Sequence, residues 1–195
     1  MAPLSTITVE SVTAKAGSEI KLAVTIANNP GISGAQLTLN FDTRLTLVGI
    51  SAGNAWSALT LTQPTELVSG CTLVFDGTDN VADKNGTVVI LTFALPTDAV
   101  LFEEYEISLS YEGGDILDAD SNAIDADIVN GKITVGELLG DANADGVVDI
   151  ADVITLRRYI AGGYGVTLDT TAIDMNADGE ITEEDVTLLR RQLLN

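Results

Sequence analysis

The sequence has no histidine, a single cysteine and few basic residues. The lack of histidine excludes Ser-His and Cys-His nucleophilic catalysis as well as histidine-ligated zinc. The lone cysteine, Cys71, permits no internal disulfide, and its apolar neighbours indicate a small side chain buried in a core. No apolar run approaches the ~20 residues that a transmembrane helix needs. These absences remove the commonest histidine-, cysteine- and membrane-based functions.

Acidic residues dominate the charge of the chain. It carries 29 Asp and Glu against 9 Lys and Arg, for a formal net charge of −20 over 195 residues. Such a charge argues against nucleic acid or an anionic membrane surface as a partner, and it suits cations or a partner with a basic patch. Because 46% of the residues are hydrophobic, the chain has enough apolar side chains for a packed core. No signal peptide follows Met1, so a secreted form would have had its signal removed.

The chain divides into two parts of different periodicity. Residues 4–136 contain runs that alternate apolar and polar side chains, for example 20–26, 35–41 and 107–111, and turn signals separate these runs. The pattern predicts an all-β sandwich or jelly roll of eight or nine short strands. Residues 137–195 instead contain two stretches of helical period. We therefore expect a multidomain protein, with a β domain over 4–136 and a small all-α domain over 137–195.

The C-terminal part repeats itself with an offset of 33 residues. The first copy covers residues 141–158 and the second covers 174–191, and 10 of the 18 paired positions are identical. Each copy begins with Asp-x-Asn-x-Asp-Gly and ends with two arginines. Two such segments in register indicate a duplicated structural unit and not a chance cluster of acidic residues.

The start of each copy has the spacing of a calcium-binding loop. Calcium prefers six to eight oxygen ligands, and a loop of this kind supplies them from positions 1, 3, 5, 7, 9 and 12. Glycine at position 6, Gly146 or Gly179, allows the sharp turn around the ion. The pattern predicts two Ca²⁺ ions. The predicted ligands are Asp141, Asn143, Asp145, Val147, Asp149 and Asp152 in the first loop, and Asp174, Asn176, Asp178, Glu180, Thr182 and Asp185 in the second.

Two details separate these loops from a complete helix-loop-helix calcium site. Position 12 is aspartate, which reaches less far than glutamate, so the following helix must lie closer to the ion. The stretch before the first loop is too short for a helix, so each copy is a loop followed by one helix. Position 9 is Asp149 in the first loop and Thr182 in the second, so we expect the second site to bind calcium more weakly.

Residues 136–195 contain only four basic side chains, which form two pairs at equivalent places in the two copies: Arg157 with Arg158, and Arg190 with Arg191. One interpretation is that each pair offsets the dipole at the end of its own helix. The other is that a pair docks on an acidic partner surface, for which the arginine side chain is well suited.

Residues 137–195 resemble a dockerin, the calcium-binding module that attaches proteins to cellulosome-type assemblies. The resemblance implies partner recognition by positions 10 and 11 of each loop and by the helix that follows. These residues are Ile150, Ala151, Arg157 and Arg158 in the first copy, and Glu183, Glu184, Arg190 and Arg191 in the second. Ile-Ala and Glu-Glu are chemically opposite, so we expect one docking mode, through the first copy with the last helix assisting.

Residues 4–136 are similar to a cohesin, the receptor of dockerins. The similarity is carried by the segments 31–42, 45–50 and 129–136. It implies a nine-stranded jelly roll that binds a dockerin on one flat sheet face. The residues that this implies for the face are Gly34, Gln36, Thr38, Thr72, Val74, Asp76 and Asp79.

Together the two resemblances imply a non-catalytic adaptor scaffoldin. Its dockerin would bind a cohesin of a larger scaffold, and its cohesin-like domain would recruit another dockerin-bearing protein for plant polysaccharide degradation. Such a protein is expected to be secreted, extracellular and associated with the cell surface. The alternative is a carbohydrate-binding module fused to a dockerin, for which Trp56 is the one obvious aromatic platform. A dockerin-bearing enzyme is disfavoured, because no catalytic constellation is visible.

Overall fold

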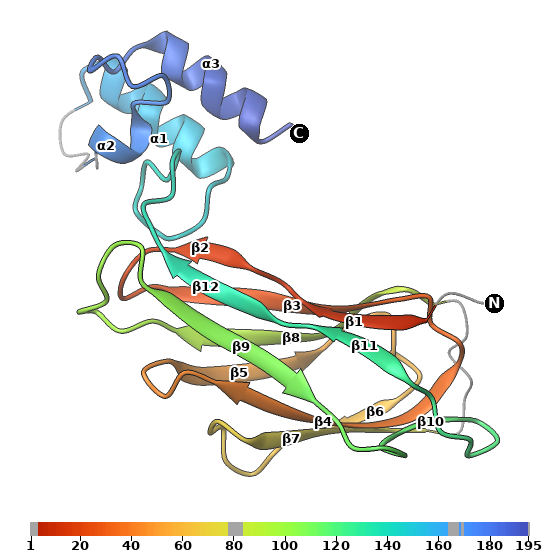
Figure 1. Cartoon of the computed structure of the whole chain (residues 1–195). Coiled ribbons are helices and arrows are strands. Elements are labelled where there is room, and N and C mark those ends of the chain that lie inside the picture. The colour runs from red at the N-terminus through yellow and green to blue at the C-terminus, as the bar shows by residue number, and fades with distance from the viewer. Residues whose placement is uncertain (1–3, 78–83, 164–167, 169, 195) are drawn as a thin grey trace.

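The computed structural model describes residues 4–77, 84–163, 168 and 170–194. It contains a β-sandwich followed by a small helical module at one end of the sandwich (Figure 1). The first sheet has five strands in the order β11-β1-β3-β8-β5. These strands are β11 (Ala126–Val129), β1 (Ser5–Val9), β3 (Glu19–Ala27), β8 (Gly86–Ala94) and β5 (Thr46–Ala52).

The second sheet has seven strands, six of them in the order β2-β12-β9-β4-β7-β6. Its central strand β4 pairs with β7 along one edge, while β9 and β10 share the other edge. The strands are β2 (Val12–Ala14), β12 (Gly131–Val135), β9 (Glu104–Ser110), β4 (Ile32–Phe41), β7 (Cys71–Asp76), β6 (Thr60–Thr62) and β10 (Ile116–Asp118).

The predicted β-sandwich is confirmed, although the described residues form 12 strands where about nine were expected. Two of the extra strands arise because the chain changes sheets within a continuous extended stretch, from β1 to β2 and from β11 to β12. Gly131 allows the second change, because a Cβ there would collide with the backbone of Glu10. Two further strands, β6 and β10, have only three residues each. Short edge strands of this kind leave little periodic signal in a sequence.

The core of the sandwich lies between the two sheets and is built by the predicted alternation. Along β4 the side chains of Ala35, Leu37, Leu39 and Phe41 are buried, while the intervening side chains face outward. Cys71 is buried in the same core, as its apolar neighbours indicated.

A hydrogen-bonded network ties one end of the sandwich together. The Glu103 carboxylate accepts hydrogen bonds from the Val100 N–H (3.1 Å) and the Tyr105 hydroxyl (2.9 Å), and it pairs with Arg44. The Arg44 guanidinium also lies 5.5 Å from the centre of the Tyr105 ring. The Val100 N–H, followed by the bonds from Tyr105 and Arg44, lowers the pKa of Glu103. Burial and the bond to Glu103 raise the pKa of Tyr105 to about 12.

The helical module contains α1 (Ile150–Ile160), the single turn α2 (Thr170–Ile173) and α3 (Glu183–Gln192). Both long helices begin with a capping box, with Asp149 and Thr182 at the N-caps. Their inward sides contribute Val153, Leu156, Val186 and Leu189 to a second core, which Ala142 of the first loop and Ile173 of α2 complete, for six buried residues among those described. In the part of the chain that is described, no helix is both long and apolar enough to cross a membrane.

Three large apolar side chains in the two stretches of helical period are exposed. Leu193 and Leu194 follow the end of α3 at Gln192, and they are 37% and 84% exposed. Tyr159 is 39% exposed near the end of α1. Periodicity does not mark the residue at which a helix stops, so Leu193 and Leu194 continue the period of α3 without belonging to it.

Candidate calcium loops and docking faces

The two predicted calcium loops fold in the same way. In the first, the Asp141 carboxylate accepts hydrogen bonds from the Asp145 N–H (3.1 Å) and the Gly146 N–H (3.0 Å). In the second, Asp174 accepts the equivalent bonds from Asp178 (3.1 Å) and Gly179 (2.8 Å). These bonds turn the backbone around the first aspartate. The glycines have φ angles of +86° and +84°, which glycine adopts without steric cost.

The aspartate at position 12 closes each loop from the first turn of the following helix. Asp152 and Asp185 are both 0% exposed. One oxygen of Asp152 accepts from the Asp149 N–H (2.7 Å) and the other from the Asn143 N–H (3.1 Å). Burial, with a further contribution from Asp141, raises the pKa of Asp152 above its ordinary value, although the N–H donors act in the opposite direction. A bound cation would offset the electrostatic cost of burying one carboxylate beside another.

The donor set of each loop fits a hard cation. Among the described residues, no group of three or more acidic side chains is arranged to hold a metal ion by itself. Each loop instead offers a mixture of carboxylate, amide and backbone carbonyl oxygens, which is the mixture that calcium takes. Asp149 and Thr182 cap their helices by accepting from Ala151 (2.6 Å) and Glu184 (3.2 Å). Both residues therefore lie at the end of the loop, where the helix begins, and their assignment as calcium ligands remains a prediction.

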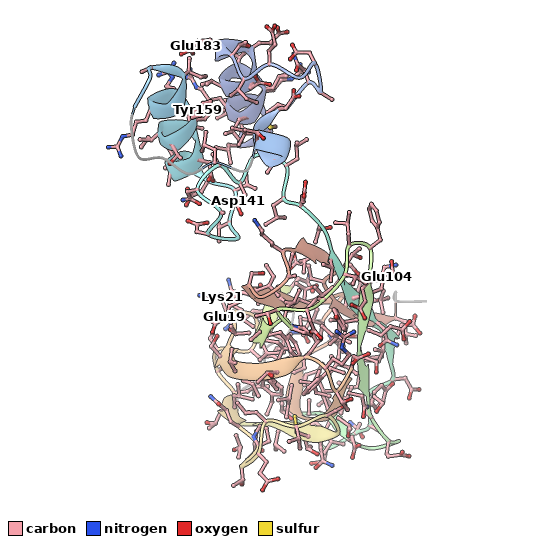
Figure 2. The ribbon with its side chains drawn as sticks, turned by 90° about the vertical axis from the view of Figure 1, so that its left-hand side faces the viewer. Glu19, Lys21, Glu104, Asp141, Tyr159 and Glu183 are labelled. Atoms are coloured by element: carbon pink, nitrogen blue, oxygen red, sulfur yellow. The ribbon has the colours of Figure 1, made fainter. Side chains whose placement is uncertain are left out.

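The two loops differ in their surroundings. Asp141 is 3% exposed, whereas Asp174 is half-buried. A Cβ placed on Gly146 would lie 3.4 Å from the Cβ of Ser18 in the β domain, so the first loop is next to the sandwich. Figure 2 shows Asp141 on the side of the helical module that faces the β domain, and Glu183 on the opposite side. The ranking of the two sites by calcium affinity, with the first site tighter, stays a prediction.

The predicted docking residues of the helical module lie on exposed surfaces at both ends of an antiparallel helix pair. The Arg157 guanidinium of α1 lies 3.9 Å from the Glu183 carboxylate at the start of α3. At the other end, the Gln192 side chain of α3 donates to the carbonyl of Leu139, just before the first loop (3.2 Å). The arginine pairs also occupy the last turns of their helices, so the dipole interpretation remains open beside the docking one.

Sequence reasoning missed part of the apolar surface of the first copy. Ile150 is 65% exposed, and Val147 and Ile154 beside it are 54% and 48% exposed. The loop spacing predicts Val147 only as a calcium ligand, and it predicts no role for Ile154. The signal was present in the repeat, because the equivalent residues of the second copy are Glu180 and Thr187.

The predicted residues of the sheet face lie together on the outer side of β4 and β7. The strands pair Gly34 with Asp76, Gln36 with Val74, and Thr38 with Thr72, so the six residues form three cross-strand rows. The seventh predicted residue, Asp79, lies outside the described residues. The same outer surface continues onto neighbouring strands through residues that the sequence did not single out: Asn40, Thr60, Thr62, Ser108 and Ser110.

Comparison with known proteins decides the family. Residues 5–135 match the cohesin domain family, and residues 139–194 match the dockerin type I domain family. The chain belongs to the cohesin family. It therefore combines a cohesin with a dockerin in one polypeptide, and both families are non-catalytic interaction modules. A search of curated proteins found no match.

Solved structures confirm the cohesin fold. A non-cellulosomal cohesin from Archaeoglobus fulgidus superposes with a TM-score of 0.60 at 20% identity, covering 68% of this chain and 91% of that one. The third cohesin of ScaC from Acetivibrio cellulolyticus, solved in complex with the ScaB dockerin, gives 0.53 at 25% identity, covering 68% and 99%. A type III cohesin of ScaE from Ruminococcus flavefaciens gives 0.61 at 14% identity, covering 69% and 89%.

Trp56 is not the exposed aromatic platform that the carbohydrate-binding alternative required. It is 1% exposed, and its ring packs edge-on against Phe75 at a centroid distance of 4.8 Å. Within the described part of the cohesin, Phe102 is the one strongly exposed aromatic side chain, at 77%. A single exposed ring on a loop is a poor platform for a sugar chain, so this alternative loses its structural basis.

Proposed function

We propose that this chain is a calcium-dependent adaptor scaffoldin, with a cohesin over residues 4–136 and a dockerin over 137–195. The dockerin binds a cohesin of a larger scaffold, while the cohesin recruits a dockerin-bearing protein. The assembly acts outside the cell, associated with the cell surface, in the degradation of plant polysaccharides. The observation that carries the proposal is the presence of both halves of this interaction in one chain.

Calcium connects the structure of the dockerin to its function. The first ion would be held by Asp141, Asn143, Asp145, Asp149, Asp152 and the Val147 carbonyl, and the second by the equivalent residues of the second loop, including Thr182. Asp149 and Thr182 are also the N-caps, so the same residues that would bind the ion also set where α1 and α3 begin. Ion binding thereby fixes the helix pair whose surface meets the receptor.

Titration calorimetry of the full chain tests the calcium requirement. We expect uptake of two ions per chain. Asp141→Ala and Asp174→Ala should each remove one binding event, because each deletes the first ligand of its loop. Asp125→Ala, at an exposed aspartate of the cohesin, is the matched control and should leave the stoichiometry unchanged. Uptake of no calcium would contradict the proposal.

Capture experiments test the adaptor role. The full chain, immobilised through its N-terminus, should bind cohesins in calcium and release them in EDTA. A chain with both Asp141→Ala and Asp174→Ala should lose this capture but should still bind a dockerin-bearing protein through its cohesin. Capture of insoluble polysaccharide by that double variant, with no capture of any dockerin, would favour carbohydrate binding and contradict the adaptor.

A further inference from the structure

The antiparallel packing of α1 and α3 places the end of each helix beside the start of the other. Arg157 near the end of α1 is 3.9 Å from Glu183 at the start of α3. The two copies are related by an offset of 33 residues, so the residue equivalent to Arg157 is Arg190 and the residue equivalent to Glu183 is Ile150. Each basic pair therefore lies beside the recognition positions of the other copy, and the dockerin has two composite faces of unlike composition.

The face at the start of α1 is apolar and has free cations beside it. Ile150 and Ile154 are four residues apart and lie on one side of α1, Val147 lies in the loop three residues before Ile150, and all three are about half exposed or more. We call these three residues the apolar patch. In the described part of the chain, neither arginine of the nearby pair, Arg190 and Arg191, has a carboxylate within ion-pair distance.

The opposite face, at the start of α3, is polar, and its positive charge is partly neutralised within the dockerin. The residues equivalent to the apolar patch are Glu180, Glu183 and Thr187. Glu183 has Arg157 beside it, so the positive charge at this end is shared with a carboxylate of the dockerin itself. A receptor that buries aliphatic side chains would have to desolvate two glutamates on this face, which is unfavourable. The two faces cannot therefore serve one receptor equally.

The cohesin of this same chain does not complement the apolar patch. The outer side of β4, β7, β9 and β6 consists of hydroxyl and amide side chains with Asp76 and Glu106 near its ends. Val74 is the single aliphatic residue among these outward positions of the described strands, with Leu117 of β10 at the edge. Burying three aliphatic side chains against this surface would lose hydration of polar groups without apolar contact in return.

We propose that the dockerin binds in one orientation, through the apolar patch with Arg190 and Arg191, to a cohesin of another chain. That cohesin has aliphatic residues at the centre of its sheet face and carboxylates beside them. The chain does not bind its own cohesin in a second copy. This inference rests on the proposed adaptor function and specifies the partner of its dockerin. The aliphatic residues of such a cohesin would complement the apolar patch, and its carboxylates would complement the two arginines.

An array of purified cohesins tests the partner chemistry. The array is sorted by sequence into cohesins with aliphatic residues and cohesins with polar residues at the positions aligned with Gln36, Thr38 and Thr72. In calcium, the full chain should bind members of the aliphatic class. Binding to the polar class alone overturns the inference but leaves the adaptor function intact. Binding to neither class overturns the adaptor function on which the inference rests.

A pair of matched variants tests the orientation on a cohesin that binds. Ile150→Glu should weaken binding on the order of 100-fold, because it places a charge in the centre of the interface. Glu183→Ala, at the equivalent place in the other copy, should stay within about threefold of the unchanged chain. Equal losses from the two variants overturn the single orientation. Both positions are exposed, so the variants keep their fold, which calcium-dependent melting verifies.

A swap of the two faces provides a rescue. The variant Val147→Glu, Ile150→Glu and Ile154→Thr should lose binding. Adding Glu180→Val, Glu183→Ile and Thr187→Ile to it rebuilds the patch beside Arg157 and Arg158 and should restore binding. Failure of the rescue overturns the inferred composite face. Sedimentation velocity of the unchanged chain in calcium completes the test, since a monomer is expected and calcium-dependent dimers or chains overturn the exclusion of self-binding.

Discussion

Glu103 joins residues that are far apart in the sequence. Its carboxylate holds the turn at Val100, the Tyr105 hydroxyl and the Arg44 guanidinium, which lies 59 residues away along the chain. These partners favour the ionised form, which is why the pKa of Glu103 lies below the ordinary value of 4.5. The network closes the end of the sandwich next to an exposed apolar turn, Val100–Phe102.

The pH dependence of cohesin stability follows from this pKa. Because the folded-state pKa is depressed, the contribution of Glu103 is fully present above the ordinary pKa and is lost as the pH falls through the depressed one. Glu103→Gln should therefore lower the melting temperature near neutral pH, and the gap to the unchanged protein should narrow as the pH falls from about 6 to about 3. Melting curves across this range check the expectation. The exposed Glu106→Gln serves as control, and a gap that widens in acid would contradict it.

At the scale of residues, local chemistry was predictable and remote contacts were not. The proposed calcium ligands lie within 12 consecutive residues of each copy, so their spacing alone indicates a loop. The ion pair between Glu103 and Arg44 cannot be predicted from spacing along the chain, because the two residues come together only when the strands pair. Trp56 was misjudged for the same reason, since Trp56 lies in a turn and Phe75 of β7, far away in the sequence, helps bury it.

Gly140 fits between the first loop and the last helix. It has a φ of +104°, and a Cβ at this position would lie 2.6 Å from the Cδ1 of Leu189 and 3.0 Å from the Cγ1 of Val148. Gly162, at the end of α1, also has a positive φ, of +76°, but a Cβ there would meet nothing within 4 Å. A comparison of substitutions at these two glycines therefore separates the cost of backbone strain from the cost of overpacking.

We expect Gly140→Ala to destabilise the dockerin by more than Gly162→Ala. Both variants should carry a backbone cost of about 1–2 kcal/mol, because alanine is strained at positive φ. Gly140→Ala should add about 1–3 kcal/mol, because its methyl group displaces a packed leucine. Thermal melting in saturating calcium, followed by the helical signal, measures the difference. Equal shifts in the two variants would show that the contact with Leu189 is unimportant.

At the scale of elements, periodicity predicted strand and helix types but not their neighbours. The alternation along β4 identified its buried side, and the outward residues of β4 and β7 then fell into register as cross-strand rows. The sharing of one edge of β4 by β9 and β10 has no local signature, because the irregular residues 111–115 interrupt the alternation between these two consecutive strands. The antiparallel meeting of α1 and α3 was likewise invisible. It changes which arginines accompany Ile150.

The whole molecule has two cores of unequal size. The sandwich core draws on both sheets, whereas the dockerin core contains six buried residues. A module with so small a core depends on bound ligands for much of its stability. The larger core of the cohesin is expected to keep its fold without a ligand.

Removal of calcium should therefore unfold the dockerin alone. With EDTA, the helical signal in circular dichroism should fall at ambient temperature, while the fluorescence of Trp56 in the cohesin stays unchanged. Excess calcium should restore the helices. In calcium, heating should give two transitions whose separation depends on calcium concentration, because mass action stabilises only the module that binds the ion. A single calcium-independent transition reported by both signals would contradict this division.

Under the proposed function, the small inner core of the dockerin would also set when the chain can bind its receptor. A polypeptide that leaves a cell passes from surroundings poor in free calcium to surroundings rich in it. Before a secreted chain met calcium, the carboxylates of Asp141 and Asp152 would repel each other and the helices would stay unformed, so Val147, Ile150 and Ile154 would not yet be positioned. Attachment inside the cell would thereby be prevented, and arrival outside would trigger assembly.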